Sequence, residues 1–406
     1  MDVLHITLLG HKDHGKSTLL GSMLMLSKAV TQARIKEAET YSKRLHKSFE
    51  PAFIMDSFYE ERLGGLTIDI TRAEIPYKNV AFSFIDVPGH EELIKNMISG
   101  ASYASTAVLL VSVQKDEGIR GQTKRHLFIA RMLGIDRLIV VVNKMDTVGY
   151  SESPFRSVKE SLSPFIEGIG FSGKNVAFIP ISAYKGDNLV KRSAGMKWYK
   201  GNSLIETLYV MSRVPATRSS GPGARMALQG FLGSERDTVA GKMLKGRIRK
   251  GDTVRIVPSG VSAKVDRVIL KGKSVTSTKT GDSAAIRLSR KISGEVRGSV
   301  ISDAGHPPKA TDSVNALIFV TDKLGKGTSI RFNGVEVPVS SIRITKHIDP
   351  VTGKYYKPKE TEPLTAVEAT LKLKSRIAAE SFSETKELGR FVLYSGRAFS
   401  GIGILR

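Results

Sequence analysis

A glycine-rich segment near the start of the chain has the residue types and spacing of a phosphate-binding loop. It reads GHKDHGKS and fits the pattern G-x-x-x-x-G-K-[ST]. In such loops, backbone N–H groups face an anion, the lysine approaches the β- and γ-phosphates, and the serine hydroxyl binds Mg²⁺. The residues predicted to contact a nucleotide here are Gly10, His11, Lys12, Asp13, His14, Gly15, Lys16, Ser17 and Thr18.

Three later segments have the chemistry that would complete this site. In DVPGH, Asp86 can hold a magnesium-bound water, and the N–H of Gly89, after Pro88, reaches a γ-phosphate. In NKMD, Asp146 can accept hydrogen bonds from the ring N–H and exocyclic amine of guanine, a pairing that adenine cannot offer. The third segment, SAY, would close over the base. The residues predicted to contact the base are Asn143, Lys144, Met145, Asp146, Ser182, Ala183 and Tyr184.

The elements that would position these segments alternate between apolar strands and amphipathic helices. The expected strands are Leu4–Leu9, Val80–Ile85, Ala107–Val113, Leu138–Val142 and Val176–Ile181. The expected helices are Ser17–Ser27, Glu91–Met97, Thr123–Leu133 and Ser157–Ile169. This alternation predicts an α/β domain with a doubly wound, mostly parallel sheet. Ligands bind at the carboxyl ends of such strands, so the segments together predict a guanine nucleotide site.

The pattern changes after about residue 214. The segment Pro215–Arg225 is a predicted linker, and beyond it short alternating runs separated by turn residues predict two antiparallel β-barrels. A second seam lies at Gly305–Ser313. We therefore expect a GTP-binding domain over 1–214 and barrel domains over 215–305 and 306–406.

The 406-residue chain carries a net charge of +23, and most of the excess lies in the barrels. Residues 215–406 hold 34 Lys and Arg against 17 Asp and Glu, which indicates a polyanionic partner such as RNA. Candidate phosphate contacts form two clusters, of which the first alternates along one expected strand and the second lies in a turn-rich loop. They are Lys242, Lys245, Arg247, Arg249 and Lys250, and Lys354, Lys357 and Lys359.

The absence of cysteine excludes a disulfide scaffold and a thiolate zinc site, and it fits a reducing compartment. No apolar run approaches the ~20 residues that span a bilayer. The chain begins with a strand and an acidic residue rather than with a signal peptide. We expect a cytoplasmic protein with no membrane partner.

The motifs resemble those of translational GTPases of the elongation factor 1-alpha/Tu type. GHKDHGKS, DVPGH and Gly65-Leu66-Thr67-Ile68-Asp69 match the family's phosphate loop and switch segments, and Met196–Leu208 resembles the archaeal and eukaryotic members. This resemblance implies an elongation factor 1-alpha-like GTP hydrolase that uses GTP/GDP and Mg²⁺. Thr67 would complete the Mg²⁺ shell (with Ser17 and, through water, Asp86), Lys16 would hold the phosphates, and His90 would orient the attacking water. Asp13 would help to hold a monovalent cation.

The implied partners are the ribosome, tRNA or another RNA, and a nucleotide exchange factor, and the implied state is a monomer. Two departures from the family pattern leave the specific role open. Lys12 replaces a small apolar residue beside the catalytic histidine, where it either alters the resting hydrolysis rate or points outwards. Ser329–Val335 contains no histidine where the family has a histidine-rich RNA contact. Specialised tRNA delivery and ribosome rescue or termination are therefore both open.

The motifs also fit two further classes of function. A GTPase subunit that assists sulfate adenylyltransferase has similar stretches after the linker, but its partner would leave the charge of the barrels unexplained. The other class is a nucleotide-binding interaction protein without hydrolysis, against which intact Lys16, Thr67 and His90 argue.

Overall fold

The computed structural model describes residues 2–55, 72–86, 104–114, 119, 121–171, 173–213, 223–322, 324–325, 327–357 and 364–406. The chain divides into two compact units. One contains Met1–Ala216 with Val351–Gly353, and the other contains Thr217–Pro350 with Lys354–Arg406. In the parts of the chain that are described, no helix is long and apolar enough to cross a membrane.

The first unit is built on a six-stranded sheet with the order β2-β3-β1-β4-β5-β6. Its strands are β1 (Asp2–Leu9), β2 (Arg72–Tyr77), β3 (Val80–Asp86), β4 (Thr106–Ser112), β5 (Arg137–Asn143) and β6 (Val176–Pro180). All pairings are parallel except that of β2 with β3. Every residue of β4 and β5 is buried, as expected for strands covered on both faces. The five predicted strands are confirmed, whereas β2 was not predicted.

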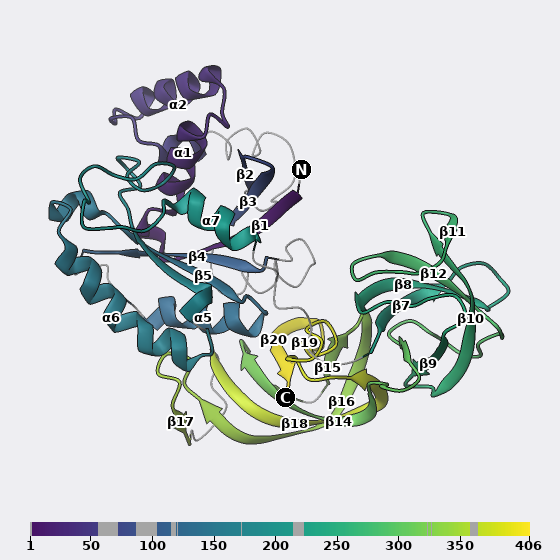
Figure 1. Ribbon diagram of the computed structural model, residues 1–406. Helices are drawn as coiled ribbons and strands as arrows, with labels where there is room; N and C mark the ends of the chain where they lie inside the picture. Colours follow the sequence, from purple (N-terminus) through teal and green to yellow (C-terminus); the bar gives the residue numbers. More distant parts are fainter. Residues whose placement is uncertain are drawn as a thin grey trace. The chain divides into compact units, whose positions relative to one another are not determined.

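Helices cover both faces of this sheet, with α1 and α7 on one side and α5 and α6 on the other (Figure 1). The helices are α1 (Lys16–Leu26), α2 (Gln32–Arg44), α5 (Gly121–Met132), α6 (Glu152–Gly168) and α7 (Leu204–Arg213), with 3₁₀ turns η1 (Lys12–His14), η2 (Met145–Val148) and η3 (Gly173–Asn175). The sequence did not predict α2, which is largely polar and buries only Ala38 and Ser42. The helix expected at Glu91–Met97 lies outside the described residues.

The second unit begins with a closed antiparallel barrel. Its strands are β7 (Arg225–Phe231), β8 (Thr238–Lys245), β9 (Thr253–Val257), β10 (Val261–Leu270), β12 (Ser283–Leu288) and β13 (Val300–Asp303), with β11 (Lys273–Val275) added at β10. The order is β10-β12-β8-β7-β13-β9, and β9 also pairs with β10, which closes the ring. Buried and exposed residues alternate along β10, so one face of the strand fills the barrel.

A second closed barrel follows. Its strands are β14 (Lys309–Val320), β15 (Thr328–Phe332), β16 (Val335–Ile348), β18 (Thr365–Ala379), β19 (Arg390–Ser395) and β20 (Ala398–Leu405), with β17 (Tyr355–Tyr356) added at β16. The order is β15-β19-β20-β14-β18-β16, and β15 also pairs with β16. The predicted fold class, an α/β domain followed by two antiparallel barrels, is confirmed.

The two barrels pack against each other within the second unit. Ala227, Leu244, Val257 and Val300 of the first barrel belong to the same apolar cluster as the core of the second. Polar contacts also cross this boundary: Arg225 donates to Glu380, and the side-chain amide of Asn333 donates to the carbonyl of Gly298 at 3.0 Å. The barrels therefore share a mixed apolar and ionic interface.

One sequence-based expectation about the first barrel is wrong. The cationic stretch from Lys242 to Lys250 is not a single strand, because β8 ends at Lys245. Gly246 follows with φ +69°, and a Cβ there would lie 3.0 Å from the Cα of Ala224, so the chain turns where only glycine fits easily. The alternation expected along this stretch is consequently lost, and Lys245 itself is buried.

Candidate nucleotide-binding site

The glycine-rich loop connects β1 to α1 through η1, and both of its glycines are required by the backbone. Gly10 has φ +143°, and a Cβ there would lie 2.8 Å from the carbonyl oxygen of Leu110. Gly15 has φ +87°, and a Cβ there would lie 2.7 Å from Nδ2 of Asn143. Side chains are disfavoured at both positions by conformation and by space. The loop can therefore curl tightly against β4 and the end of β5.

Lys16 and Ser17 begin α1, where N–H groups without helical partners favour an anion. The Lys16 ammonium lies across the loop and donates to the carbonyls of Gly10 at 3.0 Å and His11 at 3.2 Å. Ser17 and Thr18 are half-buried in the same first turn. Asp13 is exposed over 56% of its side chain and lies 3.3 Å from Nδ1 of His11. The Lys16 ammonium therefore lies on the same loop as the N-terminus of α1.

The strand that ends at the predicted magnesium ligand Asp86 lies beside the strand that leads into this loop. Asp86 is the last residue of β3, and its Cα pairs with Leu8 of β1, two residues before Gly10. Hydroxyl and carboxylate oxygens are the hard ligands that Mg²⁺ prefers, so Ser17 and Asp86 suit this ion chemically. The side chains of Lys12 and Asp86, and residues Thr67, Pro88, Gly89 and His90, lie outside the described parts of the structure.

Asn143 joins three of the predicted segments. Its side chain is buried at the end of β5, with Nδ2 donating to the carbonyl of His14 and Oδ1 accepting from the N–H of Ala183, both at 2.9 Å. His14 is also buried, and its Nδ1 lies 2.9 Å from the carbonyl oxygen of Leu110. One amide therefore fixes the distance between the phosphate loop and the loop after β6.

The segments predicted to contact the base lie on either side of the Asn143 amide. Lys144 has φ +66° and donates from Nζ to Oε1 of Gln114 at 3.2 Å, while Asp146 follows in η2 with a half-buried side chain. On the opposite loop, the hydroxyl of Ser22 in α1 donates to the carbonyl of Ala183 at 2.5 Å. Tyr184 projects outwards with 47% of its surface exposed. The side chain of Asp146 is thus half-buried at the end of the sheet where the predicted base contacts lie.

A second set of hydrogen bonds joins the segment after β5 to the segment after β6. The sequence did not predict it. The Tyr150 hydroxyl donates to Oδ2 of Asp187 at 2.8 Å, and the Ser193 hydroxyl donates to Oδ1 at 2.6 Å. Burial, together with the hydrogen bond and negative charge of Asp187, raises the pKa of Tyr150 to about 12. The phenol therefore remains a donor at neutral pH. No motif marks Tyr150 or Asp187, so only the folded structure reveals this pair.

Comparisons with known proteins agree with this geometry. A family model described as "Elongation factor Tu GTP binding domain" matches residues 1–214, and one described as "GTP-eEF1A C-terminal domain-like" matches residues 315–406. Proteins named elongation factor 1-alpha from Aeropyrum pernix and Ignicoccus hospitalis are each 33% identical over 420 residues. These matches cover 99% of this chain and 96% and 95% of the two relatives.

Among solved structures, the one titled "Crystal Structure Analysis of sup35 complexed with GDP" is 24% identical, covers 100% of this chain and 93% of that chain, and has a TM-score of 0.42. The family assignment rests on the sequence matches, because the first domain model covers more than half of the chain and the relatives align over nearly all of it. The chain therefore belongs to the elongation factor 1-alpha/Tu family of translational GTPases, and it is a GTP hydrolase.

Proposed function

We propose that this elongation factor 1-alpha-like GTPase binds GTP through the loops after β1, β3, β5 and β6, and that hydrolysis ends its binding to RNA and the ribosome. The observation that supports this best is the pair of 2.9 Å hydrogen bonds by which Asn143 joins the phosphate loop to the base loop. Such a connection holds the phosphate-contacting and base-contacting groups at one spacing, as a nucleotide requires.

The residues of the site would have distinct roles. Lys16 holds the β- and γ-phosphates, Asp146 accepts from guanine, and Ser182, Ala183 and Tyr184 close over the base. Ser17 and Thr67 would bind Mg²⁺ directly and Asp86 through water. When bound, the ion neutralises charge on the phosphates. His90 would orient the attacking water. The exposed carboxylate of Asp13 would help to hold a monovalent cation.

The family assignment also supports proposals on domain bounds, oligomeric state, location and partners. We propose a division into domains 1–214, 215–305 and 306–406, a monomeric state, a cytoplasmic location, and an exchange factor as a further partner. The relatives named above are elongation factors, so they do not favour the sulfate adenylyltransferase subunit or a rescue and termination factor. Ribosome and tRNA are accordingly the partners that we propose.

The cationic residues proposed to contact RNA differ in their accessibility. Arg247, Arg249 and Lys250 are exposed in the turn after β8, and Lys354 and Lys357 are exposed beside β17. Lys242 is half-buried and Lys245 is buried, which argues against a phosphate-backbone contact for Lys245. Lys359 lies outside the described residues.

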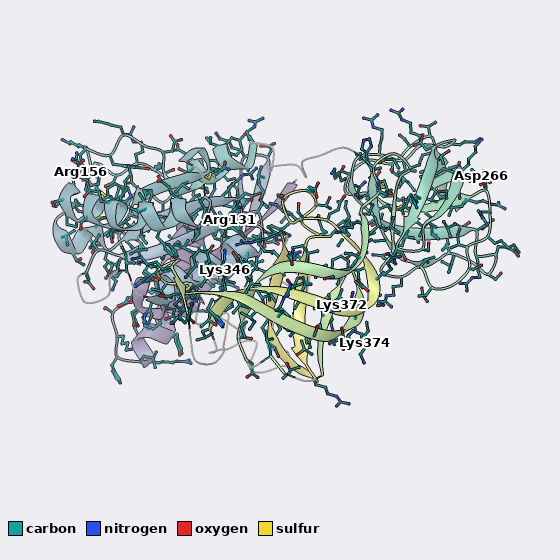
Figure 2. The ribbon with its side chains drawn as sticks, turned by 90° about the horizontal axis from the view of Figure 1, so that it is seen from below. Arg131, Arg156, Asp266, Lys346, Lys372 and Lys374 are labelled. Atoms are coloured by element: carbon teal, nitrogen blue, oxygen red, sulfur yellow. The ribbon has the colours of Figure 1, made fainter. Side chains whose placement is uncertain are left out.

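The structure also shows exposed cations outside the two predicted clusters. Lys346, Lys372 and Lys374 extend from β16 and β18 of the second barrel (Figure 2). Lys346 lies 3.4 Å from Glu368, and Lys372 lies 2.9 Å from Asp312. These carboxylates offset part of the local charge, so the turn after β8 is the better place to test RNA binding.

Replacement of the proposed catalytic histidine tests hydrolysis. His90→Ala should leave GTP affinity nearly unchanged and lower ribosome-stimulated GTP turnover by ~10²-fold or more, as expected when a group that orients the nucleophile is lost. Turnover is measured by phosphate release with ribosomes in excess. Lys16→Ala is the contrasting variant, since it should lose nucleotide binding itself. Equal turnover in His90→Ala and the unsubstituted protein would refute the role of His90.

Salt dependence tests the RNA contacts. Each phosphate contact contributes a slope of roughly −0.7 to −0.9 to the plot of log K against log salt concentration. Arg247→Gln combined with Arg249→Gln should therefore make the slope for bulk tRNA shallower by about 1.4 to 1.8. Filter binding across a salt series measures this change.

Lys291→Gln is the matched control, because Lys291 is exposed on the same barrel but is paired with Glu235 at 2.8 Å. We also expect tighter tRNA binding with GTP than with GDP. Affinity that does not change with salt or with nucleotide would contradict RNA binding by this protein.

A further inference from the structure

Asp146 lies between two residues that both reach the loop after β6. On its N-terminal side, Oδ1 of Asn143 accepts from the N–H of Ala183 at 2.9 Å. On its C-terminal side, the hydroxyl of Tyr150 donates to Oδ2 of Asp187 at 2.8 Å. The short segment that carries Asp146 is therefore tied to the neighbouring loop at both of its ends.

Asp187 is a firmly held acceptor for this second tie. Its N–H donates to the carbonyl of Ser182 at 3.0 Å and so closes the turn that contains the predicted base contacts at residues 182–184. The hydroxyl of Ser193 donates to its other carboxylate oxygen at 2.6 Å. Because each carboxylate oxygen of Asp187 accepts a hydrogen bond, its position is defined, and the phenol of Tyr150 is bound to the base of the same turn.

The backbone of Tyr150 adopts an uncommon conformation. Its φ is +59°, in the left-handed region that residues with large side chains rarely occupy unless surrounding contacts impose it. Its N–H donates to the carbonyl of Met145 at 2.9 Å, which closes η2 around Asp146. Its carbonyl accepts from Nε1 of Trp198 at 2.8 Å. These contacts offset the unfavourable conformation and fix Tyr150 directly after the turn that carries Asp146.

The ring of Tyr150 is packed as well as hydrogen-bonded. Tyr150 is half-buried, and a Cβ at Gly195 would lie 3.3 Å from its Cδ2, so the ring lies against the backbone of Gly195. Burial, the hydrogen bond and charge of Asp187 and the charge of Asp146 together raise the pKa of Tyr150 to about 12. The phenol is therefore neutral at physiological pH and donates to one of two nearby carboxylates.

We propose that Tyr150 is a positioning residue for guanine recognition, which acts through Asp187 to hold the turn that carries Asp146 at a fixed distance from the loop after β6. This inference rests on the proposed contact of Asp146 with guanine. Without the phenol, η2 is less restrained relative to the loop, and apparent affinity falls with the fraction of molecules that are competent to bind. The loss should concern the contacts of the base, because the phosphate loop is joined through Asn143.

The test compares GDP with inosine diphosphate, which lacks the exocyclic amine of guanine, by calorimetric titration of the full-length protein with Mg²⁺. The unsubstituted protein should prefer GDP, because the amine donates to the carboxylate of Asp146. Tyr150→Phe should weaken GDP binding about three- to tenfold and lower the ratio of the two affinities about threefold, because a poorly oriented carboxylate loses part of a hydrogen bond. A general loss of folded protein would leave this ratio unchanged.

Tyr199→Phe is the matched control. It removes the same hydroxyl group within the same unit, but this hydroxyl donates at 3.0 Å to the carbonyl of Asn202, in its own segment of the chain. Both affinities should therefore be unchanged. Trp198 is the only tryptophan of the chain and bonds to the backbone of Tyr150. Unchanged tryptophan emission thus verifies that Tyr150→Phe retains its local structure.

Asp187→Ala tests whether Tyr150 acts through this carboxylate. It should lower the same ratio, and Tyr150→Phe added to it should cause no further loss, because the phenol has already lost its acceptor. An unchanged ratio in Tyr150→Phe, or additive losses in the double variant, would overturn the proposal while leaving the role of Asp146 intact. Equal binding of GDP, inosine diphosphate and ADP by the unsubstituted protein would refute the role of Asp146, and this inference with it.

Discussion

Asp146→Asn is expected to weaken GTP binding by roughly 10² to 10⁴-fold and to improve binding of xanthosine triphosphate. The carboxylate is proposed to accept two hydrogen bonds from guanine, and a hydrogen bond to a charged group contributes about 1.5–3 kcal/mol. The asparagine amide donates where the carboxylate accepted, which matches the additional carbonyl of xanthine. Competition binding with GTP, xanthosine triphosphate and ATP measures the change.

Asp136→Asn is the matched control, because this carboxylate belongs to the same unit but pairs with Arg131 at 2.8 Å, before β5. It should leave nucleotide selectivity unchanged. Unsubstituted protein that bound ATP as tightly as GTP would show that the assignment of Asp146 to guanine is wrong.

Glu380→Ala is expected to lower the free energy of unfolding of the barrels by about 3–5 kcal/mol. Glu380 and Arg225 form an ion pair across the barrel boundary, and their side chains are 7% and 4% exposed. Removal of Glu380 leaves the buried charge of Arg225 with only the more distant carboxylate of Asp303, 3.8 Å from Nη1, which is costlier than loss of a surface pair. Urea denaturation of the full-length protein, followed by a signal from the barrels, measures the loss.

Two variants distinguish a loss of stability caused by the buried charge from one caused by shortening a side chain. Glu384→Ala, in the exposed turn beside Glu380, should change the free energy of unfolding by less than about 1 kcal/mol. Glu380→Leu with Arg225→Met should recover much of the loss, since an apolar pair of similar volume no longer buries a charge. If the double variant is as unstable as Glu380→Ala, loss of the carboxylate that pairs with Arg225 is not the cause.

The sequence predicted those features whose determinants are local. The glycine-rich loop is recognisable because its glycines, lysine and serine are consecutive, and strands β4 and β5 are recognisable because parallel buried strands are continuously apolar. The sequence also predicted that the nucleotide-contacting loops lie close together, because parallel strands place their carboxyl ends at one edge of the sheet. The side-chain contacts between these loops could not be predicted, because the residues that form them are far apart in the sequence. For example, 129 residues separate Asn143 from His14.

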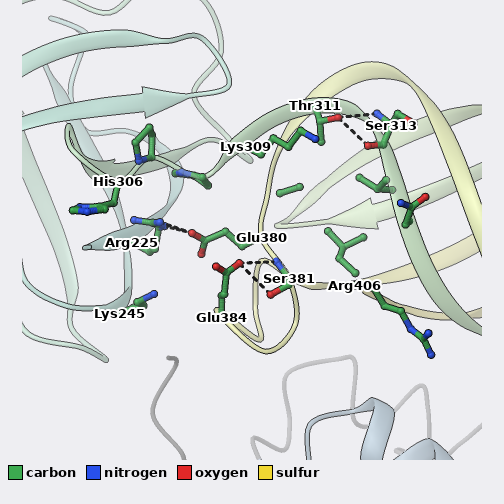
Figure 3. A pocket seen from close by; sticks show the side chains of 16 residues that line it. Arg225, Lys245, His306, Lys309, Thr311, Ser313, Glu380, Ser381, Glu384 and Arg406 are labelled. Carbon is green, nitrogen blue, oxygen red and sulfur yellow. Dashed lines mark hydrogen bonds and ion pairs between the residues drawn. The ribbon is translucent and has the colours of Figure 1, made fainter. Parts of the chain in front are cut away.

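The burial of Lys245 could not be predicted from the sequence. In the sequence it belongs to a run of cations, which suggested a solvent-exposed contact with RNA. In the fold it lies opposite Arg225 on the neighbouring strand and lines a cavity together with residues of the second barrel (Figure 3). The ion pair that balances this region joins residues 155 positions apart, so no local pattern could indicate it. Burial of charge at a domain boundary is a property of tertiary packing.

The position of β20 affects the order in which the barrels can form during protein synthesis. Ala398–Leu405 lies between β19 and β14, although it follows every other strand of its barrel in the sequence. Until the ribosome has made this segment, β14 and β19 each lack a neighbour, and such unpaired strands readily associate with other chains. All strands of the first barrel precede Lys309, so that barrel can close earlier. Its apolar surface at Ala227 and Val300 can then serve as a template on which the second barrel assembles.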